Sequence, residues 1–87
     1  MRLLIAEDER ELAKALKTIF EKHNYSVDTV FDGQAALDYA LTENYDGAVL
    51  DVMMPKLDGF SVVRRLRARG VSTPVLLLTA RSEVPDR

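Results

Sequence analysis

The stretch Gly47-Ala48-Val49-Leu50-Asp51 is a continuous apolar run that stops abruptly at a carboxylate. Because polar and apolar residues do not alternate in it, it predicts a β-strand that is buried on both faces. The same character marks Leu3-Leu4-Ile5-Ala6 and Val75-Leu76-Leu77-Leu78, whereas apolar residues alternate with polar ones in 26–30. We therefore expect four strands, with 26–30 at an edge of the sheet.

Helical periodicity fills the intervals between these strands. In each interval the apolar residues recur every three to four positions, which places them on one face of a helix. Asp32-Gly33 is a start signal for the second helix, and Gly70 is well placed as the C-terminal cap of the third. The three apolar faces comprise Leu12, Leu16, Ile19 and Phe20; Ala36, Leu37, Ala40 and Leu41; and Phe60, Val62, Val63 and Leu66.

The resulting order of elements is β-α-β-α-β-α-β, followed by a stub in which Ser82 is placed to cap one more helical turn with Pro85 inside it. Helices that connect successive buried strands require right-handed parallel crossovers. We therefore predict an α/β fold with a doubly wound parallel sheet. No linker or repeat divides the sequence, so residues 1–87 are expected to form a single domain.

Composition excludes several classes of protein. The chain has 87 residues, no cysteine, one histidine and a net charge of −2. It therefore offers no disulfide, no thiolate zinc site and no electrostatic reason to bind nucleic acid itself. Its longest uncharged apolar run is far shorter than the roughly 20 residues of a membrane helix, and residues 7–9 (Glu-Asp-Glu) interrupt the first apolar stretch. We expect a cytoplasmic protein without a signal peptide or membrane partner.

Acidic residues follow two of the predicted strands. Glu7 and Asp8 come after the first strand, Asp51 ends the third, and Thr79 follows the fourth. If the first and third strands are neighbours, with the second outside the first, the three carboxylates converge in one cleft. Their repulsion favours a bound cation, and oxygen ligands suit Mg²⁺ or Mn²⁺. The backbone carbonyl of Met53 is placed to supply one more oxygen.

Structural interpretations of the same residues stay open at this point. Asp8 with Glu11 fits a variant of the helix capping box. Asp51 fits a turn residue at a strand end, and Thr79 alone fits a β-branched strand terminator. Glu9 is better explained as a favourable charge in the first turn of a helix than as a ligand.

The acidic residues and two further segments together resemble a response-regulator receiver domain, most closely the group whose effector is a winged-helix DNA-binding domain. The segments are residues 51–59 (Asp-Val-Met-Met-Pro-Lys-Leu-Asp-Gly) and Leu78-Thr79-Ala80. The resemblance implies a flavodoxin-like fold with strand order 2-1-3-4 and Asp51 as the phosphoacceptor. It also implies Mg²⁺ held by Glu7, Asp8, Asp51 and the Met53 carbonyl, Thr79 as the phosphoryl contact and switch, and Ala80 as the small residue that leaves access.

The resemblance further implies a histidine kinase as phosphodonor, and DNA contact only through an effector domain outside this sequence. Such a module is a phosphoacceptor rather than an enzyme. A complete receiver carries a fifth strand, two more helices and a lysine that pairs with the phosphoryl group, whereas the last lysine here is Lys56. We therefore expect a truncated receiver in which phosphoryl transfer is impaired.

A truncated sheet exposes the edge of the strand at 75–78, which predicts self-association as a homodimer or domain-swapped oligomer, or pairing with a complementing fragment. The alternative function is accordingly a non-catalytic, self-associating or complementing fragment. A flavin-binding protein of the same architecture is disfavoured because no glycine-rich phosphate loop is present.

Overall fold

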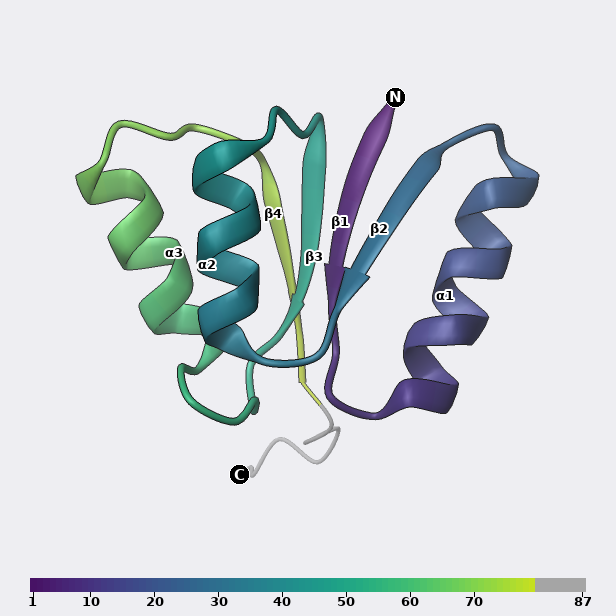
Figure 1. Cartoon of the computed structure of the whole chain (residues 1–87), viewed down its shortest axis with the longest axis horizontal. Helices are drawn as coiled ribbons and strands as arrows, with labels where there is room; N and C mark the ends of the chain where they lie inside the picture. The colour runs from purple at the N-terminus through teal and green to yellow at the C-terminus, as the bar shows by residue number, and fades with distance from the viewer. Residues whose placement is uncertain (80–87) are drawn as a thin grey trace, which may run out of the picture.

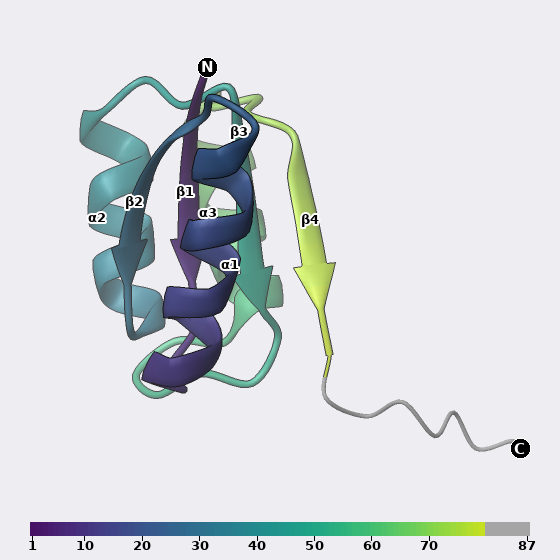
Figure 2. The ribbon, with the colours of Figure 1, turned by 90° about the vertical axis from the view of Figure 1, so that its right-hand side faces the viewer.

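The computed structural model describes residues 1–79 of the chain. In this part the chain forms one parallel sheet with helices on both faces, α2 and α3 on one side and α1 on the other (Figures 1 and 2). The elements are β1 (Arg2–Ala6), α1 (Arg10–Lys22), β2 (Ser26–Val30), α2 (Gly33–Thr42), β3 (Gly47–Asp51), α3 (Gly59–Ala68) and β4 (Val75–Leu78). The predicted α/β fold is confirmed.

The strand order is β2-β1-β3-β4, as predicted. The continuously apolar strands β1 and β3 lie in the interior, and the alternating strand β2 lies at an edge. In the parallel register, Ala6 of β1 lies beside Val30 of β2 and Leu50 of β3. The carboxyl ends of these three strands therefore stop at the same level, and the residues that follow them meet at one edge of the sheet.

A hydrophobic core covers each face of the sheet. On the side of α2 and α3, Leu4 and Leu50 of the central strands pack with Val62 and Leu66 of α3, and all four are at most 1% exposed. On the side of α1, the centre of the core is Ile5, which is fully buried. Each such side chain contributes on the order of 1.5–3 kcal/mol through burial, so the central strands are the most firmly held part of the fold.

Three residues predicted on buried helical faces are exposed: Leu12 by 40%, Ile19 by 51% and Phe60 by 54%. Helix α1 faces the sheet through Leu16 and Phe20, and its buried residue is Ala13, which the periodicity did not single out. The apolar face of a helix is wider than the strip of its surface that contacts the sheet. The predicted faces therefore included residues on the flank of each helix, and this part of the prediction was wrong.

The helix ends follow their sequence signals at α2 and α3 but not at α1. The side chain of Asp32 accepts a hydrogen bond from the Ala35 amide (2.8 Å), and Asp58 caps α3 in the same way. Gly70, with φ of +80°, follows the end of α3 as predicted. The N-cap of α1 is Glu9, without a side-chain hydrogen bond, so the capping-box interpretation of Asp8 was wrong.

No helix in residues 1–79 is long and apolar enough to cross a membrane. The predicted last helical turn at Ser82 and Pro85, and the access role of Ala80, lie outside the described residues.

Candidate functional site

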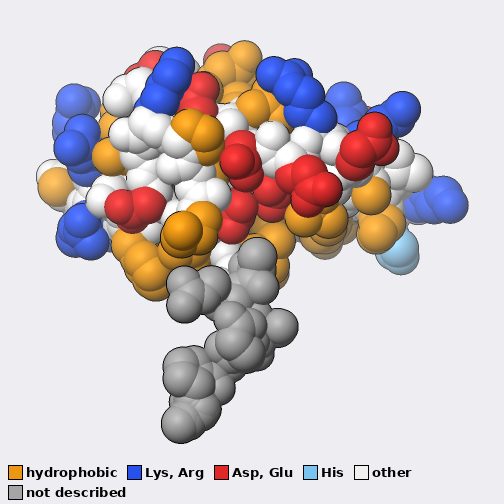
Figure 3. Space-filling model, turned by 90° about the horizontal axis from the view of Figure 1, so that it is seen from below, with side chains coloured by type: hydrophobic (Ala, Val, Ile, Leu, Met, Phe, Trp, Pro, Cys, Tyr) orange, Lys and Arg blue, Asp and Glu red, His pale blue; other side chains and the backbone are white. Residues whose placement is uncertain are grey.

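Three carboxylates meet at the carboxyl-terminal edge of the sheet. Glu7 and Asp8 follow β1, Asp51 ends β3, and one oxygen from each lies within 4.8 Å of the others. Viewed from this edge, acidic side chains gather near the middle of the face (Figure 3). Their convergence follows from the neighbouring positions of β1 and β3, and it confirms the geometry that the sequence predicted.

Two of the three carboxylates are buried and held in place by peptide groups. Glu7 is 5% exposed and its Oε2 accepts a hydrogen bond from the Glu9 amide (2.9 Å). Asp51 is 8% exposed and its Oδ1 accepts a longer hydrogen bond from the Met53 amide (3.3 Å). Asp8, by contrast, is exposed. The pocket thus has two fixed carboxylates in its floor and one at its rim.

The proximity of these groups affects the protonation of Glu7. Burial is the largest cause that raises the pKa of the Glu7 carboxyl, and the negative charges of Asp51 and Asp8 raise it further. The Glu9 amide acts in the opposite direction by donating to the ionised form. The pocket therefore holds negative charge at a free-energy cost, which a proton or a cation would reduce.

The ligand set fits a hard divalent cation. All side-chain donors are carboxylate oxygens, which Mg²⁺ and Mn²⁺ prefer, and the described residues hold no cysteine or histidine near the cluster. The side chain of Met53 is 58% exposed, while its amide contacts Asp51. The Met53 carbonyl as a further ligand stays a prediction.

Thr79 opens onto the same cleft. It lines a cavity of about 230 Å³ together with Glu7, Asp51 and Leu78. Glu9 and Leu12 line this cavity as well, although the sequence pattern gave them only helical roles. Thr79 and two residues with buried carboxylates therefore line one small space at the edge of the sheet.

The loop after Asp51 is folded tightly against the strand that carries it. The Gly59 amide donates to the Val52 carbonyl (2.9 Å), and a Cβ at Gly59 would lie 2.6 Å from the Asp51 carbonyl oxygen. A side chain at this position would therefore displace the backbone of Asp51. Lys56, in the same loop, has its Nζ 3.7 Å from Asp32 Oδ2. The close approach of Gly59 to the backbone of Asp51 is a contact with the site that the sequence did not predict.

An open parallel sheet of this order, with acidic residues at its carboxyl-terminal edge, is the architecture of a receiver domain. The profile of the response regulator receiver domain matches residues 3–87, and the chain belongs to this family.

Relatives and solved structures agree with this assignment. The transcriptional regulatory protein TctD of Salmonella typhimurium is 56% identical over 87 residues, which are 100% of this chain and 39% of TctD. The receiver domain of the Francisella response regulator 1452 is 40% identical with a TM-score of 0.90, over 95% of this chain and 69% of that one. The response regulator TrrA of Thermotoga maritima, in complex with Mg²⁺-BeF, is 33% identical with a TM-score of 0.87, over 93% and 70% of the two chains. The chain thus spans about two-fifths of the length of the curated relatives it matches.

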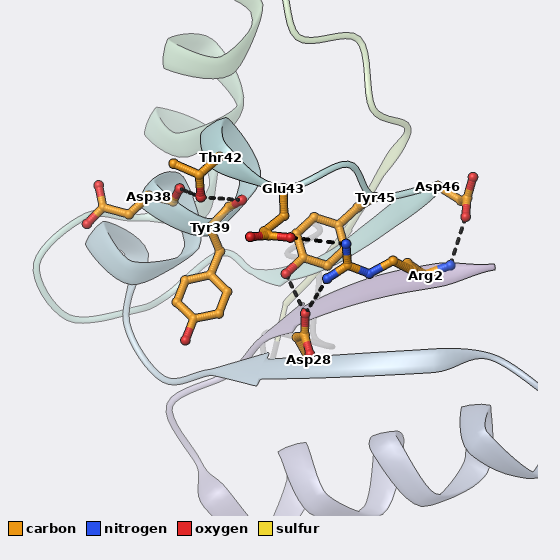
Figure 4. A network of polar contacts seen from close by, with 8 residues as sticks. All are labelled: Arg2, Asp28, Asp38, Tyr39, Thr42, Glu43, Tyr45 and Asp46. Atoms are coloured by element: carbon orange, nitrogen blue, oxygen red, sulfur yellow. Dashed lines mark hydrogen bonds and ion pairs between the residues drawn. The ribbon is translucent and has the colours of Figure 1, made fainter.

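A second polar cluster, at the opposite edge of the sheet, has a structural role (Figure 4). The Arg2 guanidinium contacts Asp28 Oδ2 (3.0 Å) and Glu43 Oε1 (3.1 Å) and lies 4.9 Å from the centre of the Tyr45 ring. The Tyr45 hydroxyl donates to Asp28 Oδ2 (2.7 Å), and burial is the main cause that raises the pKa of Tyr45. These contacts tie β1, β2 and the loop before β3 together.

Proposed function

We propose that this receiver domain accepts a phosphoryl group on Asp51 from the phosphohistidine of a histidine kinase, with Mg²⁺ or Mn²⁺ bound in the carboxylate pocket. The observation that carries the proposal is the convergence of Glu7, Asp8 and Asp51 within 4.8 Å at the carboxyl-terminal edge of the sheet. The complex of TrrA with Mg²⁺-BeF supports the cation, because TrrA shares this fold at a TM-score of 0.87.

Glu7, Asp8, Asp51 and the Met53 carbonyl are proposed to hold the cation. When bound, it neutralises charge that develops on the oxygens of the transferred phosphoryl group. The buried position of Asp51 keeps bulk water away from the nucleophile, and the Met53 amide fixes its Oδ1. The other carboxylate oxygen, Oδ2, is proposed to be the atom that attacks the incoming phosphorus atom.

In the transfer itself, a carboxylate oxygen of Asp51 forms a bond to phosphorus. The bond between phosphorus and the histidine nitrogen breaks, and its electron pair stays on the imidazole, which takes up a proton from solvent. The product is an aspartyl-phosphate, a mixed anhydride. The Thr79 hydroxyl, which lines the same cavity as Asp51, is proposed to donate a hydrogen bond to the phosphoryl group and so to carry the change to the loop after β4.

Residues 1–87 are proposed to be a single receiver domain of a cytoplasmic, DNA-binding regulator whose effector domain lies outside this sequence. The name of TctD as a transcriptional regulatory protein supports this reading. Within the 87 residues no lysine follows Lys56, whose ammonium group lies beside Asp32.

The test is phosphorylation by a small phosphodonor such as acetyl phosphate, followed by intact mass. The expected result is a gain of one phosphoryl group that requires Mg²⁺ and is abolished in Asp51→Asn. The matched control is Asp38→Asn, an exposed aspartate on α2 that bonds Gln34, and it should be phosphorylated like the wild type. Phosphorylation that persists in Asp51→Asn, or none under any condition, would contradict the proposal.

A second candidate function is self-association of the chain, as a homodimer or a domain-swapped oligomer. The supporting observation is that β4 pairs only with β3 among the described strands, while Leu76 is 59% exposed. An apolar groove of about 310 Å³ lies beside this strand, lined in part by Phe20, Tyr25 and Val75. The two candidates are separated by two measurements with and without phosphodonor: intact mass detects the phosphoryl group that a phosphoacceptor gains, and light scattering detects the assembly of a self-associating chain.

A further inference from the structure

The loop between β1 and α1 carries Asp8, the one exposed carboxylate of the pocket. Helix α1 begins at Arg10 without a side-chain cap, so a capping bond does not fix the end of this loop. Glu7 and Asp51 are held by burial and by peptide hydrogen bonds. The position of Asp8 instead depends on how the backbone on either side of it is anchored.

Both ends of this loop are anchored on the end of β2. The Glu7 amide donates to the Val30 carbonyl (3.1 Å). Three residues further on, the Arg10 guanidinium carbon lies 3.9 Å from the centre of the Phe31 ring, which is the geometry of a cation–π contact. Val30 and Phe31 are adjacent, so two consecutive residues contact the loop, one before Asp8 and one after it.

Arg10 is committed to this contact rather than to the acidic residues near it. Glu9 and Glu11 flank it in the sequence, yet Arg10 forms no ion pair with a residue in the part of the chain that the structure describes. An arginine that served only to neutralise the carboxylates would be expected to pair with one of them. Its guanidinium lies on an aromatic face instead, which favours a role in holding the loop.

We propose that Arg10 and Phe31 are positioning residues for the metal site, and that their stacking holds Asp8 where it can complete the carboxylate pocket. This inference rests on the proposed cation site at Glu7, Asp8 and Asp51. It assigns a function in metal binding to two residues outside the acidic cluster. Removing either member loosens Asp8 and weakens cation binding, although neither residue contacts the cation.

The test measures Mn²⁺ binding to the whole chain from the electron paramagnetic resonance signal of free Mn²⁺. Coulomb's law alone predicts that Arg10→Gln tightens binding, because it removes a positive charge near the cation. The positioning role predicts the opposite, an affinity about two- to fivefold weaker, as expected for loss of an exposed cation–π contact. The control is Lys14→Gln, which removes the same charge one turn further along α1 and should not weaken binding.

The same titration on Phe31 variants separates stacking from charge. Phe31→Leu should weaken binding as much as Arg10→Gln, the double variant should be no weaker than either, and Phe31→Tyr should retain wild-type affinity. Urea unfolding checks that each variant is folded, and Arg10→Gln at an exposed position is the variant least able to disturb the core. Unchanged or tighter binding in both single variants overturns the inference alone. Absence of Mn²⁺ binding by the wild type overturns the proposed cation site and the inference with it.

Discussion

At the scale of single residues, Glu7 has the least favourable electrostatic position in the pocket. Its carboxyl group is buried and faces two other carboxylates, and its pKa is raised, first by burial and then by Asp51 and Asp8. The Glu7 carboxyl group therefore binds a proton more tightly in the folded state than in the unfolded chain. As pH rises from the ordinary glutamate pKa through the raised one, the metal-free protein loses stability.

Glu7→Gln should accordingly stabilise the metal-free protein at neutral pH, by about 0.5–2 kcal/mol in the free energy of unfolding, as for other relieved charge clusters. The amide oxygen of glutamine can still accept the hydrogen bond from Glu9. Urea unfolding with a chelator measures the gain, and Glu21→Gln, at an exposed position on α1, is the charge-matched control. Added Mg²⁺ should stabilise the wild type more than the variant. A variant less stable than the wild type without metal would contradict this account of the pocket.

At the scale of elements, α3 begins at a cap that closes the loop after Asp51. Asp58 accepts a hydrogen bond from the Ser61 amide (2.8 Å), which is the main cause that lowers the pKa of Asp58, and Arg64 lowers it further. For a carboxylate with a lowered pKa, the stabilisation is present above its ordinary pKa and is lost as pH falls through the folded value.

Asp58→Ala should therefore lower the urea midpoint at about pH 7, and the difference from wild type should shrink as the pH falls below the ordinary aspartate pKa and through the lowered pKa of the folded state. Asp58→Asn, which keeps an acceptor oxygen without the charge, should lie between the two at neutral pH. Helicity followed by circular dichroism during unfolding makes the measurement. If the difference in urea midpoint between the wild type and Asp58→Ala does not depend on pH, the stabilisation by Asp58 comes from packing rather than from its charge.

Local signals explain which elements the sequence predicted well. Asp32 precedes a glycine and caps α2 with its own side chain, so the information for this predicted helix start lies within four residues. Asp58 caps α3 in the same way, although no helix start was predicted from it. Helix α1 starts at Glu9 without such a bond, and its beginning was misplaced on Asp8. The exposure of Ile19 was not predicted, because helical periodicity shows which residues share a face of α1 but not how much of that face the sheet covers.

The carboxylate pocket was predictable because it follows from topology. Parallel strands end at one edge, so Glu7 after β1 and Asp51 at the end of β3 are brought together once those strands are neighbours. The stacking of Arg10 on Phe31 was not predictable, because it depends on how the start of α1 lies relative to the residue after β2, 21 positions further along the sequence. Contacts between loops have no periodicity from which they could be inferred.

At the scale of the whole molecule, the two outer strands of the sheet, as far as residues 1–79 form it, differ in polarity. In β2 polar and apolar residues alternate, which suits an edge strand. In β4 the apolar run is continuous, as it is in the strands β1 and β3 that lie in the interior of the sheet. An apolar strand with unpaired backbone groups is a template for pairing with another chain. Figure 2 shows β4 at the margin of the sheet, with its outer side facing away from the other strands.

The proposed self-association through β4 predicts that Leu76→Lys turns an assembled chain into a monomer at about tens of micromolar, with the dissociation constant raised at least about tenfold, equivalent to about 1.4 kcal/mol. The lysine leaves the core intact because Leu76 is 59% exposed, and it places a charge at the edge that pairing would have to bury.

Tyr39→Lys is the matched control, since Tyr39 is a large exposed residue (43%) on α2, away from β4. Sedimentation velocity distinguishes the outcomes: a wild type that is already monomeric, or a Leu76→Lys variant that assembles like the wild type, would exclude the β4 edge as the interface. Assembly lost in both variants would instead point to a helical interface, because only Leu76 lies on the sheet.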